Sequence, residues 1–383
     1  MSTKKILILT AGFGEGHNTA AYNISEALKE KPDVEVSIVD IYQQTLPGTT
    51  KFLQACYRFA INKLPMAWGI IFNFLDRPGG LEKSLFMAAR LRRSLAKKVS
   101  EFQPDVIVST YPLYAFLIAQ LRESCHAACY VPLVTVITDS TAINTSWYRA
   151  KSDFFIVADE ETALVLRKDN IPSERVHVLG FPVAPRLATM TPLPETAGAP
   201  WKILYLPSSK TIQAFAVIRA LAELPDVQVT VITGRMRELH AFLGKSGVID
   251  GKRVQLIGWT NQIPELLSTH HLYVGKAGGA IVHEAMAAQC PILISQIVPG
   301  QEEGNIELIE RHDIGRLAAH YPATLAASAA EVFAGDAATW RRWKQHLKTI
   351  SYPAASQDIA EFVLGIFEGE INKEVESIKR LRG

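Results

Sequence analysis

The chain has 383 residues and a mass of 42.3 kDa, which is more than one ordinary domain holds, so we expect two domains. With 48% hydrophobic and 20% charged residues both domains can bury full cores, and the lack of an uninterrupted apolar stretch of about 18 residues argues against a membrane-spanning helix. Four cysteines do not make a disulfide framework in a chain of this length, which favours a cytoplasmic protein.

Two of the cysteines, Cys125 and Cys129, lie close together with His126 between them. Three soft ligands could begin a metal site, but no fourth ligand is in view and the neighbouring residues are apolar. Ordinary packing is the better interpretation. We therefore expect no metal ion at this segment.

The first element is predicted to be a buried strand at residues 5–9, whose apolar run is too short for a secretory signal. Three alternate glycines between residues 12 and 16 then form a turn before a helix at about residues 20–29. Their G-x-G-x-G spacing differs from the G-x-G-x-x-G fingerprint of dinucleotide sites, and Asp40 lies later than the usual ribose-binding acid. A dehydrogenase is therefore the weaker hypothesis.

His17 lies where this turn meets the helix. A single histidine at such a place can cap the helix or pack against its neighbours. It can also act as a general base, because the pKa of an imidazole is close to neutral pH. The residues around it leave these roles open.

Residues 51–100 combine aromatic side chains with ten basic and only two acidic residues, whereas the rest of the chain carries 30 basic and 36 acidic ones. A pair of amphipathic helices closing on its own domain would not need so one-sided a charge, so an anionic membrane surface is the favoured partner. No recognised nucleic-acid motif accompanies the basic residues. The side chains expected at the membrane are Trp68, Phe72, Arg58, Lys63, Arg92 and Arg93.

Further buried strands of the first half are predicted at residues 105–109, 133–137, 154–157 and 176–179. Asp139 follows one of them, and an acid at the carboxyl end of a strand lies at the crevice of such a sheet. It could accept a proton, orient His17 or simply cap the next turn. Residues 182–200 are rich in proline, alanine and threonine, which indicates an interdomain linker.

The second half alternates buried strands with helical stretches. The strands are predicted at residues 202–206, 227–232, 254–257, 272–274 and 292–295. This alternation is typical of a parallel sheet with right-handed crossovers.

Residues 274–286 are predicted to form a strand, a tight turn with paired glycines, and a helix. The free N–H groups and positive dipole end of the helix attract a phosphate, and Glu284, one turn into the helix, could accept hydrogen bonds from ribose hydroxyls. Such turns also occur merely to pack a helix on a sheet. Gln301, Glu302 and Asn305 open the next helical stretch at a neighbouring strand end, which favours a nucleotide-sugar site.

Residues 275–285, 291–294 and 299–305 resemble the donor-binding region of the monogalactosyldiacylglycerol synthase and processive diacylglycerol glucosyltransferase family, which is related to the murein glycosyltransferase that uses UDP-N-acetylglucosamine. The likeness covers most of the chain. It implies an α/β GT-B fold, in which two Rossmann-like parallel-sheet domains face a central cleft. The expected parts are an acceptor and membrane-binding domain at 1–184, a linker at 185–200, a UDP-sugar-binding domain at 201–350, and a C-terminal helix within 351–383 that crosses back to the first domain.

On the acceptor side, the resemblance implies that Gly14, Glu15 and Gly16 form the acceptor loop. His17 would be the catalytic base, with Asp139 as its helper or alternative. Thr138-Asp139 and Trp147 match the family, whereas Asn144 occupies the place of a family histidine.

On the donor side, Thr233-Gly234-Arg235 and Gly258-Trp259-Thr260 match family segments near the nucleotide, and the second would offer backbone groups to uracil. Pro207-Ser208-Ser209 replaces a glycine-rich turn, and His271 replaces an acid. The donor-binding residues implied are Ser208, Gly234, Arg235, Gly258, Trp259, Lys276, Gly278, Gly279, Ala280, Glu284, Gln301, Glu302 and Asn305.

The expected activity is an inverting, metal-independent transfer of a hexose from a UDP-sugar to the hydroxyl of diacylglycerol or a glycolipid. The family resemblance implies that the protein needs no metal ion or other cofactor. The enzyme would be cytoplasmic and peripheral on the inner face of a membrane. The alternatives are a murein-type transferase of UDP-N-acetylglucosamine to a lipid-linked acceptor, a GT-B UDP-sugar epimerase, and a non-catalytic binder of UDP or lipid.

Overall fold

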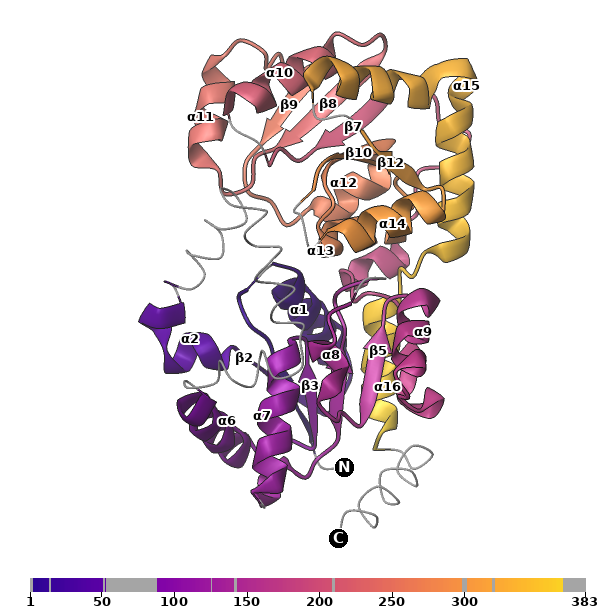
Figure 1. Ribbon diagram of the computed structural model, residues 1–383. Helices are drawn as coiled ribbons and strands as arrows, with labels where there is room; N and C mark the ends of the chain where they lie inside the picture. The colour runs from indigo at the N-terminus through magenta and orange to yellow at the C-terminus, as the bar shows by residue number, and fades with distance from the viewer. Residues whose placement is uncertain are drawn as a thin grey trace. The chain divides into compact units, whose positions relative to one another are not determined.

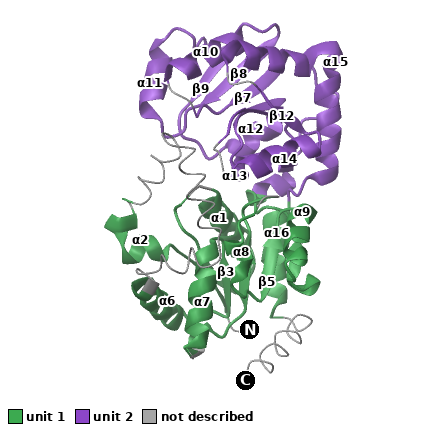
Figure 2. Ribbon diagram, in the orientation of Figure 1, with its two compact units in different colours: residues 1–185, 354–383 green, residues 186–353 purple. Residues whose placement is uncertain are grey.

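The computed structural model describes residues 3–13, 15–50, 52, 88–124, 126–140, 143–208, 211–297, 302–318 and 321–367. The chain divides into two compact units. Unit 1 contains residues 1–185 and 354–383, and unit 2 contains residues 186–353 (Figure 2). The boundary between them lies at the first residue of the predicted linker, so residues 186–200 belong to unit 2.

Unit 1 is built on a parallel sheet in the order β2-β1-β3-β4-β5-β6. Figure 1 labels β2, β3 and β5 of this sheet. Four of these strands bury every residue on both faces or nearly so, because helices cover both sides of a parallel sheet. The strands are β1 (Lys4–Leu9), β2 (Val34–Val39), β3 (Val106–Ser109), β4 (Leu133–Val136), β5 (Phe154–Val157) and β6 (Val176–Val178).

The alternation of side chains along β1 shows how the two faces are filled. Ile6 and Ile8 point to one core, which they share with Ile24 of α1. Leu7 and Leu9 point to the other core, which is closed by α6 and α7. The helical elements of unit 1 are α1 (Glu15–Lys29), α2 (Ile41–Thr45), α6 (Ala88–Phe102), α7 (Pro112–Glu123), η2 (Ala127–Cys129), α8 (Ser146–Arg149), α9 (Glu160–Lys168), η3 (Ser173–Arg175) and α16 (Ala355–Gly365).

The last helix, α16, belongs to unit 1 although nearly 170 residues of unit 2 precede it. Its Ile359 and Val363 join the core beside α1. Gln357 Nε2 donates a hydrogen bond of 2.7 Å to the carbonyl of Pro185. The chain therefore leaves unit 1 and returns to it at neighbouring points.

Unit 2 repeats the architecture with a parallel sheet in the order β12-β11-β10-β7-β8-β9. Its strands are β7 (Trp201–Tyr205), β8 (Val227–Ile232), β9 (Val254–Ile257), β10 (Leu272–Lys276), β11 (Ile292–Gln296) and β12 (Gly315–Leu317). The helical elements are η4 (Pro185–Thr189, which begins in unit 1), α10 (Thr211–Ala222), α11 (Arg237–Lys245), α12 (Ile263–Thr269), α13 (Gly279–Ala287), α14 (Glu303–Arg311) and α15 (Pro322–Ile350, interrupted at Ala334–Ala337).

Each sheet has a point where the strand order reverses. In unit 1 the chain runs from β1 outward to β2 and then starts again on the other side with β3, and in unit 2 it runs from β7 to β9 and then returns to β10 beside β7. Ligands of open α/β sheets bind outside the carboxyl ends of the strands at such switch points. The fold therefore selects the ends of β1 and β3 in unit 1, and of β7 and β10 in unit 2, as the places to look for sites.

The prediction of two α/β domains with parallel sheets is confirmed. Within the described ranges, no helix combines the length and the apolar character needed to cross a bilayer.

Candidate functional site

The turn after β1 is held in place by polar side chains. Asp40 Oδ2 accepts a hydrogen bond of 3.0 Å from the Gly12 amide, while its Oδ1 accepts one of 2.8 Å from Gln43 and so caps α2. The Thr10 hydroxyl donates to Asn18 Oδ1 at 3.0 Å. Asp40 thus fixes the backbone of the turn, a role that its position in the sequence did not indicate.

His17, in the first turn of α1, lies at the switch point of unit 1. Its Nδ1 is 2.7 Å from the Thr138 hydroxyl, just beyond the end of β4, and its carbonyl accepts a hydrogen bond of 3.0 Å from the Thr110 hydroxyl, just beyond β3. The predicted helper, Asp139, instead accepts a hydrogen bond of 2.7 Å from Trp147 Nε1. The His17 ring therefore contacts the Thr138 hydroxyl, a residue to which the sequence reasoning assigned no role.

Burial lowers the pKa of His17 below its ordinary value of 6.5, although the Asp139 carboxylate and the Thr110 backbone act in the opposite direction. At neutral pH the imidazole is therefore uncharged and able to accept a proton. Asp139 influences it through charge rather than through a hydrogen bond.

Aromatic rings surround the imidazole on two sides. The ring centroid of Tyr111 lies 5.2 Å from that of His17 in an edge-on arrangement, and that of Trp147 lies 5.7 Å away. Phe13, in the glycine turn, stacks on Tyr111 at 6.0 Å. The histidine thus lies in an apolar aromatic setting, which is consistent with its lowered pKa.

The other residues predicted for unit 1 are less closely grouped. Gly14 lies outside the described residues, Glu15 begins α1, and Gly16 follows it. Asn144 accepts a hydrogen bond of 2.9 Å from the Ser146 amide at the start of α8, so it serves the local turn.

Of the predicted membrane residues, Arg92 and Arg93 lie on α6 with exposed side chains, while Leu91, Leu95 and Val99 of the same helix are buried in the core. α6 therefore presents a basic face outward. Trp68, Phe72, Arg58 and Lys63 lie outside the described residues.

In unit 2, β10 leads into the turn that begins α13. A Cβ added at Gly275 would clash with the Tyr273 hydroxyl, which donates to the Lys276 carbonyl at 3.0 Å, so a side chain at this position would force the structure to shift. Gly278 is the N-cap of α13 and makes no side-chain capping hydrogen bond. Gly279 and Ala280 are the first two helical residues, so their N–H groups have no partner within the helix and lie where the sequence predicted a phosphate.

Two predicted donor segments meet at this turn. Lys276 Nζ lies 3.3 Å from Glu302 Oε1, and the side chain of Glu302 is only 7% exposed. Asn305 Nδ2 donates a hydrogen bond of 2.8 Å to the Ala277 carbonyl. Lys276, Glu302 and Asn305 therefore form one polar group beside Gly278. Gln301 lies outside the described residues.

Glu284 lies further along α13 and is partly buried. Burial raises the pKa of its carboxyl to about 7, the Arg186 guanidinium opposes this rise, and the Glu265 carboxylate adds to it. The ionisation of Glu284 is thus favoured by the positive charge of Arg186 and opposed by the negative charge of Glu265 on α12.

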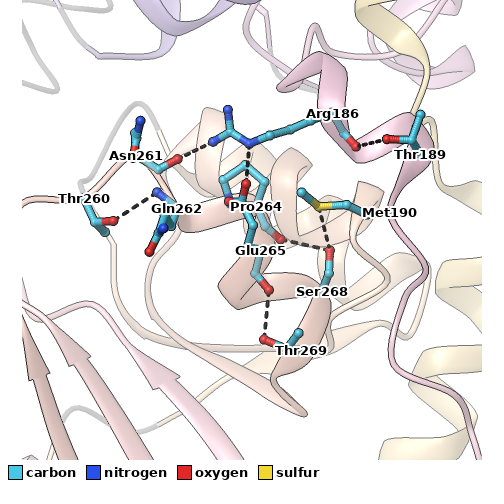
Figure 3. Close-up of polar contacts among 10 residues, drawn as sticks. All are labelled: Arg186, Thr189, Met190, Thr260, Asn261, Gln262, Pro264, Glu265, Ser268 and Thr269. Carbon is cyan, nitrogen blue, oxygen red and sulfur yellow. Dashed lines mark hydrogen bonds and ion pairs between the residues drawn. The ribbon is translucent and has the colours of Figure 1, made fainter.

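Arg186 is the centre of the polar contacts in Figure 3. Its Nε lies 2.8 Å from Glu265 Oε1, and its terminal nitrogen donates to the carbonyl of Asn261 in the turn between β9 and α12 (Figure 3). Sequence reasoning did not single out Arg186, because its partners lie more than seventy residues away.

The remaining predicted donor residues lie at the carboxyl ends of the unit 2 strands. Ser208 follows β7 and donates to Gln296 Oε1 at 2.8 Å. Gly234, with a φ of 55°, and Arg235 follow β8. Gly258 and Trp259 follow β9, and the Trp259 side chain is 64% exposed. They therefore lie at the same end of the sheet as the beginning of α13.

His271 lies at the opposite end of the sheet, where the strands begin. It precedes β10, and its Nδ1 accepts a hydrogen bond of 3.0 Å from the Lys202 amide at the beginning of β7. This departure from the family pattern is therefore structural. Among the described side chains, no group of three or more His, Cys, Asp or Glu residues is placed to hold a metal ion.

Comparison with known proteins shows which proteins the chain resembles. Residues 17–183 match the family model described as monogalactosyldiacylglycerol (MGDG) synthase. The chain is 26% identical over 336 residues to the chloroplastic monogalactosyldiacylglycerol synthase of Spinacia oleracea. The aligned region covers 82% of this chain and 63% of that protein. It is 24% identical over 377 residues to the processive diacylglycerol beta-glucosyltransferase of Bacillus subtilis, with 95% of each chain covered.

The chain is a relative of the diacylglycerol glycosyltransferases. The comparisons confirm the resemblance to these glycosyltransferases that the sequence analysis described, and the prediction that the chain is a glycosyltransferase. The matched region contains His17, Asp139 and Trp147 and ends at Val183, so it lies within unit 1.

Solved structures of other proteins have the same fold as this chain. A putative UDP-N-acetylglucosamine 2-epimerase from Listeria monocytogenes superposes with a TM-score of 0.61 at 13% identity, covering 97% of this chain and 98% of that one. MurG from Acinetobacter baumannii superposes with a TM-score of 0.58 at 13% identity, covering 94% and 99%. At these identities the likeness concerns the fold alone, and the predicted GT-B fold is confirmed.

Proposed function

We propose that the chain is an inverting glycosyltransferase that moves a hexose from a UDP-sugar to the hydroxyl of diacylglycerol or a glycolipid at a membrane surface. The observation that carries the proposal is the grouping of Lys276, Gly278, Glu302 and Asn305 at the start of α13. It occurs in a relative of proteins named as diacylglycerol glycosyltransferases.

The donor diphosphate would bind the free amides of Gly279 and Ala280 and the ammonium group of Lys276. Backbone donors and a fixed cation stabilise the negative charge that develops on a departing diphosphate, so the reaction would need no metal ion. Glu284 would accept hydrogen bonds from the ribose. Gln301, Glu302 and Asn305 would hold the sugar or the diphosphate.

His17 would remove the proton from the acceptor hydroxyl. Since its Nδ1 faces the Thr138 hydroxyl, the nitrogen that takes the proton would be Nε2, with Nδ1 carrying its own hydrogen toward Thr138. The lowered pKa supports this role, because it keeps the base neutral at physiological pH. The deprotonated oxygen would attack the anomeric carbon from the face opposite the diphosphate, which inverts its configuration.

The acceptor would be reached at an anionic membrane surface. Arg92 and Arg93 project from α6 while its apolar side is buried, so they are available to lipid headgroups. The relatives' names supply the acceptor class, which is diacylglycerol.

The direct test is to incubate the purified protein with labelled UDP-sugars and diacylglycerol vesicles, and to identify the product. Release of UDP together with a glycosylated diacylglycerol is expected. A product formed from UDP-sugar without any acceptor would favour an epimerase, transfer only to a lipid-linked murein precursor would favour the murein-type reaction, and UDP binding without turnover would indicate a non-catalytic binder.

The variant His17→Ala tests the proposed base. Turnover should fall by about 10²- to 10⁴-fold, because a general base contributes an effect of this size, while UDP affinity should stay nearly unchanged. His126→Ala, which changes a histidine of the same unit that lies away from the turn, is the control. Unchanged turnover of His17→Ala would remove this residue from the base role.

A further inference from the structure

Arg186 connects the beginning of unit 2 to the turn that follows β9. Its guanidinium donates to the carbonyl of Asn261 and pairs with Glu265 at 2.8 Å (Figure 3). The Thr260 hydroxyl, by contrast, accepts a hydrogen bond of 3.0 Å from the Gln262 amide and so ties the turn only to itself. Arg186 therefore links residues 258–262 to a segment that is distant in the sequence.

The backbone that carries Arg186 is itself fixed. The Thr189 hydroxyl donates to the Arg186 carbonyl at 3.0 Å. The Ser268 hydroxyl contacts Met190 Sδ at 3.6 Å, and the Leu193 amide donates to the Ser268 carbonyl at 3.0 Å. Since Ser268 lies on α12, the segment around η4 is attached to the same helix whose N-terminal turn receives the guanidinium.

The charge of Arg186 acts on two carboxylates on neighbouring helices. Glu265 on α12 is its ion-pair partner, and Glu284 on α13 is close enough for the guanidinium to stabilise its ionised form. α12 packs against α13. Arg186 therefore contacts the turn after β9, and its charge also acts on Glu284, the residue assigned to the ribose.

Three residues of the turn, Trp259, Asn261 and Gln262, are exposed, and Gly258 and Thr260 are half-buried. Trp259 is 64% exposed, so its ring does not anchor the loop in a core. A loop whose backbone groups are to recognise a base must be fixed by interactions of its own, because specificity requires groups held in place before the ligand binds.

We propose that Arg186 is a positioning residue that fixes residues 258–262 and thereby gives the donor site its preference for a uracil base. The guanidinium is suited to this, because its planar fork serves a carboxylate and a carbonyl at the same time, which a lysine ammonium on a flexible stem does less well. The inference rests on the proposed function and on the expectation, implied by the family resemblance, that Gly258-Trp259-Thr260 offers backbone groups to uracil.

The test uses calorimetry on the full chain with three probes: UDP, ADP and inorganic pyrophosphate. Arg186→Met should weaken UDP binding about tenfold or more, the size expected when a charge-assisted hydrogen bond is lost, while pyrophosphate affinity should stay as in the wild type. The ratio of UDP to ADP affinity should fall with it. Arg186→Lys should retain part of the preference, since it keeps the charge beside Glu265.

The matched control is Arg219→Met, which removes an exposed arginine paired with Glu223 at 3.0 Å on α10 of the same unit. It should leave all three affinities unchanged. Thermal melting of each variant shows whether it is folded at the temperature of the titration, and Arg186→Lys serves as the test if Arg186→Met is not.

An unchanged UDP to ADP ratio in a folded Arg186 variant would overturn the proposal, and so would an equal loss of UDP and pyrophosphate affinity, which would indicate a general disturbance of the site. Failure of the wild-type protein to bind UDP would contradict the proposed function instead. The two failures are therefore distinguishable.

Discussion

At the residue scale, the contact between Thr138 and His17 changes how the proposed base is understood. A carboxylate beside the imidazole would have been the expected orienting group, yet Asp139 is engaged by Trp147. A hydroxyl can hold the Nδ1–H tautomer without placing a full charge against the ring. The base then stays neutral and weakly basic, which fits its lowered pKa.

Thr138→Val keeps the shape of the side chain and removes this hydrogen bond. We expect kcat to fall about tenfold, because one hydrogen bond that orients the base is lost, while the KM for the donor stays the same. Thr138→Ser should restore most of the activity. A steady-state comparison of the three proteins on vesicles would check this, and a kcat of Thr138→Val equal to the wild type would show that Thr138 does not orient His17.

Some residues of the candidate site could be predicted from the sequence and others could not. Lys276, Glu302 and Asn305 were predicted because they follow neighbouring strands, and the ends of such strands share one edge. Thr138 and Arg186 were missed because each contributes through a partner distant in the chain, 121 residues for Thr138 and 75 for Arg186. Sequence periodicity carries no information about such pairings.

At the scale of elements, β10 and α13 form the part of the site that the sequence described best. The apolar strand, the glycines and the helical spacing all follow from local rules, and the structure places β10 at Leu272–Lys276 and α13 at Gly279–Ala287. The contact between Tyr273 and Gly275 explains one of the glycines by close packing rather than by ligand binding.

Gly275→Ala should therefore destabilise the protein. The new Cβ would meet the Tyr273 hydroxyl and ring, and such overpacking in a core typically costs about 1–3 kcal/mol. Urea unfolding of the full chain would measure the loss. Gly244→Ala in α11 is the control, since its Cβ would meet no atom within 4 Å and alanine favours a helix. Equal stability of Gly275→Ala and the wild type would show that β10 can move to accept the methyl group.

At the scale of the whole molecule, the alternation of strands and helices was sufficient to predict two parallel sheets, because only helical crossovers connect parallel strands. The order of the strands was not predicted. The two switch points, between β1 and β3 in unit 1 and between β7 and β10 in unit 2, were therefore not predicted either. These points bring His17 close to Thr110 in one unit and Ser208 to the sheet edge beside α13 in the other.

The two units should also differ in their response to acid. The described part of unit 2 buries three histidines, His270, His271 and His283, and burial lowers the pKa of each to about 4. His271 Nδ1 accepts a hydrogen bond of 3.0 Å from the Lys202 amide, so a proton added at this nitrogen would set two N–H groups against each other. In the unfolded chain these groups titrate near 6.5, and the unfolded state therefore binds more protons than the folded state between pH 6.5 and pH 4.

The three histidines should accordingly lower the stability of unit 2 as the pH falls from 6.5 toward 4, by up to about 3 kcal/mol each, and should lower it no further below that range. Glu284, whose carboxyl pKa is raised to about 7, binds its proton more readily in the folded state and offsets part of this loss. Hydrogen exchange of the full chain, corrected for the intrinsic pH dependence of the amides, would show the β10 and α13 peptides losing protection before those of β3 and β4. His283→Gln carries no titrating ring and should remove about a third of the effect. Equal protection of the unit 2 peptides at pH 7 and pH 5 would mean that the buried histidines do not control its acid stability.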